Sequence, residues 1–301
     1  MSHTPEDGRA DSWRSRINGL VPESISEKRI AIVGCGSVGS FISDELARCG
    51  ILFFTLIDPD TVEWPNLTRT VYGSEDIGTK KVVALARHLK NIFPDISCTT
   101  HACEVQELGN RLSDTFKCFD LVIAAVDDPK ANGLLDRLCY ALGVPTVFVG
   151  IYKGAKGGEV IAVSPSLTPC FGCATGGTRE ALSEVASFQG IQRDRDYGTN
   201  KLTAEIALGS DIHFVCNAAI KICLSMVAQA GDALHPFLYS QLNQGIHYLM
   251  LGMEPSYYIF PSTHKDAIGQ HAFQSLWLKT TRRDDCPRCG TDEYRIAINT
   301  A

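Results

Sequence analysis

Three glycines follow a short apolar segment early in the chain, in the spacing Gly-x-Gly-x-x-Gly. They are Gly34, Gly36 and Gly39, and the segment before them, Ile30–Val33, is continuously apolar. A strand that turns through such a loop into a helix forms a cradle for nucleotide phosphates, because glycine permits close backbone approach and a helix start offers unpaired N–H groups. Asp58 follows nineteen residues after Gly39, where a carboxylate can accept hydrogen bonds from ribose hydroxyls. By itself this pattern fits many nucleotide-binding proteins, dehydrogenases included.

Several polar and cationic residues follow Asp58 in the sequence. Asp60 is followed by Asn66, Arg69 and the pair Lys80-Lys81. Cationic groups at this place suit a triphosphate better than a nicotinamide, because guanidinium and ammonium groups bind phosphate oxygens strongly. Exposed surface charge is the usual alternative for an arginine or a lysine. The spacing that Arg69 and Lys81 share with Asn66 favours phosphate binding.

These residues together resemble the ThiF/MoeB/ubiquitin-activating (E1-like) superfamily, whose members adenylate the C-terminus of a ubiquitin-fold protein. The recurring signature of that family is Asp-x-Asp, Asn-Leu-x-Arg and Gly-x-x-Lys-Val, and here it starts at Asp58, Asn66 and Gly78. The family lysine directly precedes valine, which selects Lys81 over Lys80. The resemblance covers roughly residues 25 to 290. It implies ATP as cofactor, bound by the glycine loop together with Asp58, Asp60, Asn66, Arg69, Lys81 and Asp127.

Asp127 follows the apolar segment Leu121–Val126. A residue at this place emerges at the carboxyl edge of a sheet, which faces the ligand crevice in open α/β proteins. The resemblance implies a Mg²⁺-binding aspartate there and, with Arg69 and Lys81, a catalytic role for it. A helix N-cap is the alternative, and Asp128-Pro129 fits that role on its own. We therefore assign the cap to Asp128 and the Mg²⁺ to Asp127.

Two Cys-x-x-Cys pairs, Cys170/Cys173 and Cys286/Cys289, have the spacing that lets two thiolates share one tetrahedral metal ion. They predict a Zn²⁺ site, with four reduced structural cysteines as the alternative. Four thiolates leave no open coordination position. The site should therefore be structural, tying the C-terminal tail to the middle of the chain.

A nucleophilic cysteine is present in the crossover loop of many ubiquitin-activating relatives, yet residues 174 to 209 contain none. The nearest are Cys216 and Cys223, on an apolar stripe with the i, i+3, i+4 spacing of a core helix. Core packing is the expected role of both. If a thioester forms, Cys216 is the catalytic candidate, because it lies nearer the helix start, where a thiolate is stabilised.

The predicted elements alternate between strand and helix, which implies a Rossmann-like α/β fold with a mostly parallel sheet and helices on both faces. Strands are expected at 30–33, 52–57, 97–103, 121–125 and 144–149, and helices at 37–49, 80–93 and 130–142. A strand at 158–163, a long helix at 211–230 and short strands at 245–250, 256–260 and 275–279 follow. We divide the chain into an N-terminal arm (1–28), a nucleotide-binding core (29–173), a crossover loop (174–209) and a zinc-stapled, β-rich C-terminal part (210–301).

Composition limits the partners and the compartment. A formal net charge of −6 argues against nucleic acid as the main partner. No continuous apolar run approaches the roughly 18 residues of a membrane span, so no membrane partner is expected. Residues 1 to 27 lack the apolar centre of a signal peptide, which predicts a cytoplasmic protein.

The resemblance implies an adenylyltransferase that acts on a ubiquitin-like or sulfur-carrier protein, with possible transfer to a cysteine afterwards. It also implies a homodimer in which an N-terminal arginine reaches the partner's triphosphate, and Arg14 and Arg16 are both open candidates. Two other classes remain. An NAD(P)-dependent oxidoreductase has no use for the triphosphate-binding cations, and an inactive scaffold subunit has no need of intact Arg69, Lys81 and Asp127.

Overall fold

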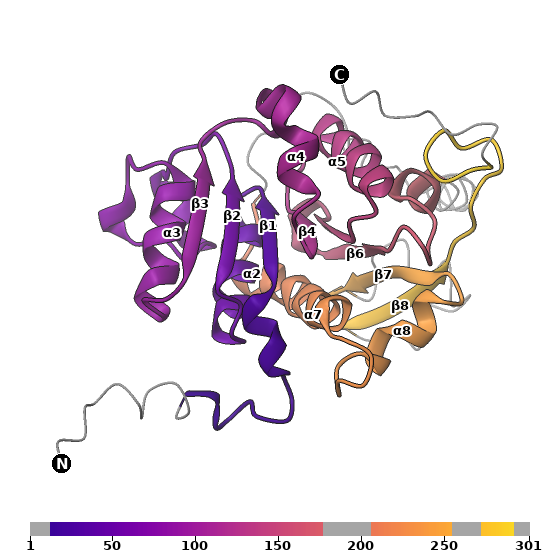
Figure 1. Ribbon diagram of the computed structural model, residues 1–301. Helices are drawn as coiled ribbons and strands as arrows, with labels where there is room; N and C mark the ends of the chain where they lie inside the picture. Colours follow the sequence, from indigo (N-terminus) through magenta and orange to yellow (C-terminus); the bar gives the residue numbers. More distant parts are fainter. Residues whose placement is uncertain (1–12, 177–205, 255–271, 292–301) are drawn as a thin grey trace, which may run out of the picture.

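The computed structural model describes residues 13–176, 206–254 and 272–291. Its strands form an eight-stranded sheet in the order β3-β2-β1-β4-β5-β6-β7-β8 (Figure 1). The parallel part consists of β1 (Arg29–Val33), β2 (Phe53–Ile57), β3 (Ser97–His101), β4 (Leu121–Ala124) and β5 (Thr146–Ile151). The antiparallel part consists of β6 (Gly157–Val163), β7 (Ile246–Gly252) and β8 (Gln274–Lys279). The predicted fold class is confirmed.

Helices cover both faces of this sheet (Figure 1). One apolar core joins the sheet to α2 (Ser37–Arg48), α3 (Lys81–Ile92), α7 (Gly209–Val227) and α8 (Pro236–Leu242). The other core joins it to the 3-10 helix η4 (Val105–Arg111), α4 (Leu112–Phe116) and α5 (Pro129–Leu142). Along β1, Ile30 and Ile32 belong to the first core, and Ala31 and Val33 to the second. Burial on both faces explains why this strand is continuously apolar in the sequence.

The connection from β2 to α3 is irregular and holds the polar signature. It contains two 3-10 helices, η2 (Trp64–Thr68) and η3 (Ser74–Asp76). A bridge between Thr61 and Lys80 closes the connection onto itself. Further 3-10 turns, η1 (Glu23–Glu27) and η5 (Lys153–Ala155), precede β1 and follow β5.

The observed elements differ from the predicted ones mainly at their ends. α7 begins at Gly209 instead of Asp211 and ends at Val227 instead of Ala230, and the short helix α8 is an addition. The strand predicted at 256–260 and most of the crossover loop lie outside the described residues. β6, β7 and β8 extend the sheet that the nucleotide-binding core begins. The division of the chain into four segments stays a prediction.

Helix α7 is long and apolar enough to cross a membrane, with a mean hydropathy of 1.3 over its best window. This segment is not evident from the apolar runs of the sequence, because polar residues such as His213 and Lys221 interrupt them. More than half of that window, 56%, is buried inside the protein. A core helix passes the same test, and the packing of α7 in the core it shares with α2 and β6 is of that kind.

Residues 13–28 of the N-terminal arm pack at the edge of the sheet opposite the carboxyl ends of the parallel strands (Figure 1). The ring of Trp13 packs on Phe93, with centroids 4.6 Å apart, and Ile17 packs against the core. Leu20, three residues further along, is 63% exposed. The Arg14 guanidinium lies over Trp13 and donates a hydrogen bond of 3.2 Å to the carbonyl of Val21.

Candidate functional site

The glycine loop, Gly34 to Gly39, joins β1 to α2, and neighbouring atoms leave almost no space at its first and last glycines. Gly34 has a φ of +93°, and a Cβ atom there would lie 2.4 Å from the carbonyl oxygen of Ala125. A Cβ at Gly39 would lie 1.8 Å from the carbonyl oxygen of Gly34. A Cβ at Gly36, the residue before the first helical turn, would meet no atom within 4 Å. Gly34 and Gly39 thus allow the close packing of the turn, while Gly36 keeps the start of α2 approachable.

Asp58 lies at the end of β2 and is buried, with 6% of its surface exposed. Its carboxylate accepts hydrogen bonds from the backbone N–H of Cys35, at 2.6 Å, and of Asp60, at 2.8 Å. Burial raises the pKa of this carboxyl, and the Cys35 hydrogen bond and the nearby charge of Lys81 oppose that rise. Asp58 therefore holds the glycine loop in place. Each carboxylate oxygen accepts more than one hydrogen bond, so ribose binding by Asp58 is compatible with this role.

Lys81 is the first residue of α3, and its side chain is only 11% exposed. Its ammonium group forms an ion pair of 2.6 Å with the carboxylate of Asp60, which is 61% exposed. Lys80, its neighbour in sequence, is exposed and donates a hydrogen bond to the carbonyl of Pro59. The two lysines thus differ in burial and in partner, and the choice of Lys81 as the phosphate-binding lysine stays a prediction.

Tyr72 connects the glycine loop to α3. Its buried hydroxyl donates a hydrogen bond of 2.6 Å to the carbonyl of Cys35, and it lies 3.4 Å from the carbonyl of Lys81. Burial strongly raises the pKa of this phenol, which keeps it a neutral donor. No spacing in the sequence points to Tyr72. Its role follows from the path of the connection between β2 and α3.

Asn66 and Arg69 lie on either side of the end of η2. The side-chain oxygen of Asn66 accepts a hydrogen bond of 2.9 Å from the backbone N–H of Glu63, which closes the turn. The backbone N–H of Arg69 donates to the carbonyl of Asn66 at 3.1 Å. Both residues are half-buried. Asn66 therefore shapes the turn that carries Arg69.

The start of α7 lies against Arg69. A Cβ at Gly209 would lie 3.1 Å from the carbonyl oxygen of Thr68 and 3.3 Å from the Cα of Arg69. One turn further, the imidazole of His213 is hydrogen-bonded to the backbone of Arg69 and stacks on Phe41 of α2, with centroids 3.8 Å apart. Burial lowers the pKa of this imidazole. His213 therefore links the arginine turn to the helix that follows the glycine loop, a contact that the sequence did not predict.

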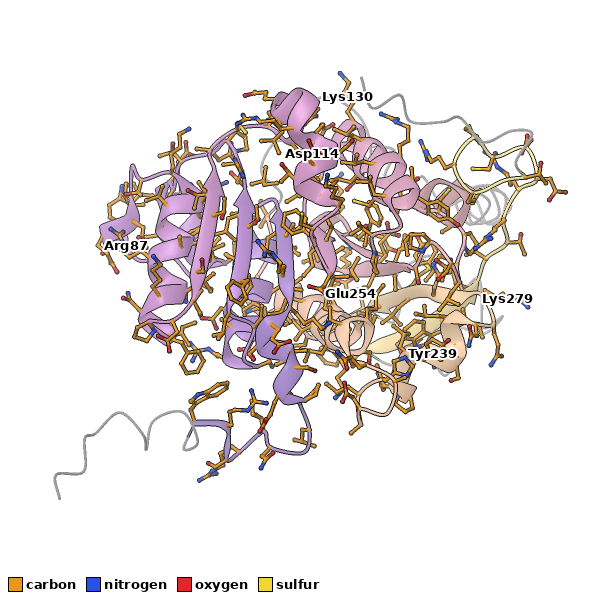
Figure 2. The ribbon with its side chains drawn as sticks, in the orientation of Figure 1. Arg87, Asp114, Lys130, Tyr239, Glu254 and Lys279 are labelled. Atoms are coloured by element: carbon orange, nitrogen blue, oxygen red, sulfur yellow. The ribbon has the colours of Figure 1, made fainter. Side chains whose placement is uncertain are left out.

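Acidic residues follow the strands β2, β3 and β4 at the carboxyl edge of the parallel sheet. The label of Lys130 in Figure 2 lies at this edge. Asp128 caps α5, accepting hydrogen bonds from the backbone N–H groups of Lys130 and Ala131, at 3.0 and 3.2 Å. Asp127 beside it is exposed. Burial raises the pKa of Glu104, and the negative charges of Asp128 and Asp60 raise it further, so these carboxylates share one edge. The assignment of the cap to Asp128 is confirmed, and Asp127 stays the predicted Mg²⁺ ligand.

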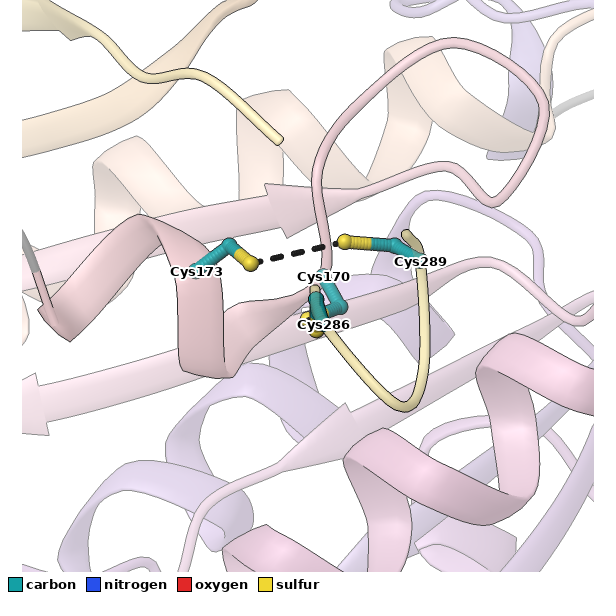
Figure 3. A group of neighbouring side chains, drawn as sticks. All are labelled: Cys170, Cys173, Cys286 and Cys289. Carbon is teal, nitrogen blue, oxygen red and sulfur yellow. Dashed lines mark hydrogen bonds between the residues drawn. The ribbon is translucent and has the colours of Figure 1, made fainter. Parts of the chain in front are cut away.

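The four cysteines of the two predicted pairs meet in one buried cluster (Figure 3). All four sulfur atoms lie within 4.8 Å of one another. Cys170 and Cys286 are 3.7 Å apart at sulfur, and Cys173 and Cys289 are 3.5 Å apart. Tetrahedral Zn²⁺ with zinc–sulfur bonds of about 2.3 Å sets its sulfur ligands about 3.8 Å apart. The donor set and its spacing therefore fit Zn²⁺.

Cys216 is fully buried in α7, and burial raises the pKa of its thiol to about 12. Cys223 is equally buried, and its pKa is raised as well. Both belong to the core between α7 and the sheet. A thiol in this position is a poor nucleophile at neutral pH, because little thiolate is present and no substrate reaches it. The structure thus supports the expected core role and gives no support to Cys216 as a catalytic residue.

Residues 15–254 match the model of the ThiF family. This chain belongs to the ThiF family. Ubiquitin-like modifier-activating enzyme 5 of Bombyx mori is 33% identical to it over 161 residues, which are 50% of this chain and 41% of that protein. The same enzyme of Drosophila melanogaster is 34% identical over 162 residues, covering 50% of this chain and 40% of that protein. The match thus spans about two fifths of the length of these relatives.

Solved structures of E. coli MccB share the fold. MccB with ATP superposes with a TM-score of 0.62 at 16% identity, covering 89% of this chain and 68% of that one. MccB with AMPCPP and its MccA peptide superposes with a TM-score of 0.65 at 17% identity, covering 95% and 76%. The shared region reaches from the parallel sheet into the antiparallel strands.

Proposed function

We propose that this ThiF-family protein is an adenylyltransferase that activates the C-terminal carboxylate of a ubiquitin-like or sulfur-carrier protein. A carboxylate oxygen attacks the α-phosphorus of ATP, the bond to the bridging oxygen of the β-phosphate breaks, and pyrophosphate leaves. The products are an acyl-adenylate and pyrophosphate. The names of the relatives support this, since one activates a ubiquitin-like modifier and the other was solved with ATP and with a peptide.

One observation carries the proposal: the cationic residues and the phosphate cradle belong to one connected unit. Tyr72 joins the loop to α3, Asp58 anchors the loop, and Lys81 lies within the electrostatic reach of Asp58. The start of α7 and His213 hold Arg69 beside the same unit. Groups fixed before the substrate arrives stabilise developing phosphate charge without reorganisation.

In this scheme each residue has a distinct task. The backbone N–H groups at the start of α2 bind phosphate oxygens, and Asp58 binds ribose while holding the loop. Arg69 and Lys81 neutralise the triphosphate, and Asn66 orients the turn between them. Asp127 would hold Mg²⁺, which shields phosphate charge when bound. Lys81 must then share its ammonium group between Asp60 and the nucleotide.

We also propose a cytoplasmic homodimer whose ATP site is completed by an arginine from the partner copy. Arg14 is engaged within its own chain, over Trp13 and toward the carbonyl of Val21. Arg16 is exposed. Between the two open candidates, this difference favours Arg16.

Pyrophosphate exchange tests the proposal. Labelled pyrophosphate should enter ATP only when the protein is mixed with an acceptor that has a free C-terminal carboxylate. The acceptors are purified ubiquitin-like and sulfur-carrier proteins and the MccA peptide, each compared with its C-terminally amidated form. Exchange with the amidated forms would contradict the proposed chemistry.

The two alternative functions give different results in the same samples. An oxidoreductase would bind NAD(P) in preference to ATP by calorimetry and show no exchange. A scaffold subunit would bind neither nucleotide productively and would support exchange only after a second, active subunit is added.

A further inference from the structure

Asp136 is a buried carboxylate on the apolar face of α5, and its side chain is 0% exposed. Its neighbours on that face, Leu135, Leu138 and Cys139, belong to the core beneath the helix. A buried charge in such surroundings is costly unless it is paired and hydrogen-bonded. The partners of Asp136 therefore explain why a carboxylate is present here.

Within the described part of the chain, Asp136 accepts three hydrogen bonds from residues that lie between the cysteines of the two pairs. The backbone N–H groups of Phe171 and Gly172, between the first two cysteines, donate at 2.8 and 3.1 Å. The guanidinium of Arg288, between the second two, donates at 2.6 Å. One carboxylate thus contacts both pairs, although more than 100 residues separate them in sequence.

A side chain at Gly172 would displace the guanidinium of Arg288 from this contact. A Cβ atom there would lie 2.3 Å from the guanidinium nitrogen of Arg288 and 3.5 Å from the carboxylate of Asp136. The glycine lets the arginine pass over the first pair to reach the carboxylate. The close approach fixes the two cysteine pairs relative to each other.

Charge balance makes the two residues depend on each other. Four thiolates around one Zn²⁺ carry a net negative charge, so an isolated carboxylate beside them would weaken the site. The cationic Arg288 offsets the charge of Asp136 through their ion pair. Removing Arg288 leaves the carboxylate of Asp136 buried without its counter-charge.

We propose that Asp136 and Arg288 are positioning residues for the metal, an ion pair that holds the two cysteine pairs together so that Zn²⁺ is retained. Neither residue binds the metal. Groups of this kind, which orient metal ligands from behind, change metal affinity by about 10- to 100-fold when removed. The proposal concerns zinc retention and stands apart from the proposed adenylation.

Zinc release from the full-length, zinc-loaded protein tests it. Release into a chromogenic chelator is followed at a temperature where circular dichroism shows each variant to be folded. Asp136→Asn should release zinc about 10- to 100-fold faster than the unmodified protein. The matched control is Asp44→Asn, because Asp44 is also a largely buried carboxylate, bonded to His88 and Arg48 on the opposite face of the sheet. Both variants should lose thermal stability, and only the first should lose zinc quickly.

A second variant keeps the test decisive if Asp136→Asn does not fold. Arg288→Met retains the apolar stem and removes the charge, and it should release zinc faster as well. In the double variant the two effects should not add, because both remove the same contact. Equal release from Asp136→Asn and Asp44→Asn, additive effects in the double variant, or an unmodified protein without zinc would overturn the proposal.

Discussion

The nucleotide edge and the cysteine cluster are built in opposite ways. The nucleotide edge consists of the glycine loop and the polar residues that follow β2, β3 and β4. It is assembled from consecutive strand ends within residues 34 to 128, and its groups are partly open to solvent. The cysteine cluster is closed, and it joins a segment that follows β6 to a segment that follows β8. Helix α5 takes part in both, since Asp128 caps its start and Asp136 lies eight residues further along. Parallel-sheet topology thus positions the first site, and packing positions the second.

Loss of a zinc ligand should have the largest effect. Cys286→Ser removes one of four thiolates from a closed site, so zinc content should fall from one per chain to nearly none. Stability should fall by about 4 kcal/mol or more, as for other losses of a structural metal. Metal analysis and thermal unfolding measure the two effects. Cys118→Ser, at an exposed cysteine, is the control and should change neither.

The same variant distinguishes the two regions. Where Cys286→Ser remains folded, it should keep most of its pyrophosphate exchange, because the cluster has no open coordination position. Complete loss of exchange in folded protein would show that the cluster acts in the chemistry.

The phosphate-facing cations should give the next largest effect. Lys81→Ala and Arg69→Ala each remove a preorganised charge, which typically costs a hundredfold or more in rate, about 3 kcal/mol of barrier. Zinc content and thermal unfolding should stay near those of the unmodified protein. Lys80→Ala is the matched control, because this exposed neighbour carries the same charge one position away. Near-normal exchange in Lys81→Ala, or an equal loss in Lys80→Ala, would contradict the assignment.

The glycine turn and the cap of α5 could be predicted from the sequence because their geometry is local. Gly34 and Gly39 are required by contacts within the turn itself, and Asp128 caps the helix that it directly precedes. The cysteine pairs were predicted for a different reason. Metal-ligand spacing within each pair is short, and four thiols need a common partner wherever the fold brings them.

The supporting residues could not be predicted, because each depends on a contact between distant segments. Tyr72 meets Cys35, His213 meets Phe41, and Asp136 meets Arg288, from 37 to more than 150 residues apart. Nothing in the local sequence distinguishes Asp136 from an ordinary helix residue, because its hydrogen-bond donors come from distant segments. The second role of Asp58, as the anchor of the glycine loop, also needed the folded backbone.

A pH-dependent effect of intermediate size should arise in the antiparallel strands. His247 is fully buried, bonded to the carbonyl of Ala162 and the hydroxyl of Thr280, and burial lowers its pKa to about 4. The unfolded chain, with a histidine pKa of about 6.5, binds the proton first, so stability is complete above pH 6.5 and falls as the pH drops toward 4. The loss at this site amounts to roughly 3 kcal/mol.

Urea unfolding of the unmodified protein and His247→Gln at pH 7 and pH 4.5 measures this effect. The variant should be less stable at pH 7 but lose less stability on acidification. Parallel loss in both proteins would show that His247 does not titrate in this range. Nucleotide binding at pH 7 should stay unchanged, because His247 lies in the antiparallel strands and, among the described residues, has no hydrogen bond to the nucleotide edge.

His213 should have a smaller effect, confined to the nucleotide edge. His213→Phe keeps a ring to stack on Phe41 and removes the hydrogen bond to Arg69. A hydrogen bond of this kind contributes about 1 kcal/mol, so the KM for ATP should rise about fivefold with little change in kcat. A fall in kcat at constant KM would mean that His213 does not act by positioning Arg69.

The smallest effect should come from Cys216. Its thiol packs in the core between α7 and the sheet, and its raised pKa leaves little thiolate at neutral pH. Cys216→Ala should therefore leave pyrophosphate exchange within about twofold, since the truncation leaves only a small cavity in the core. Non-reducing gels of enzyme, ATP and acceptor should show no reducible adduct on this chain while exchange proceeds. An adduct that forms on the unmodified protein and disappears in Cys216→Ala would mean that α7 opens during the reaction, and the adenylate would then be an intermediate on the way to a thioester.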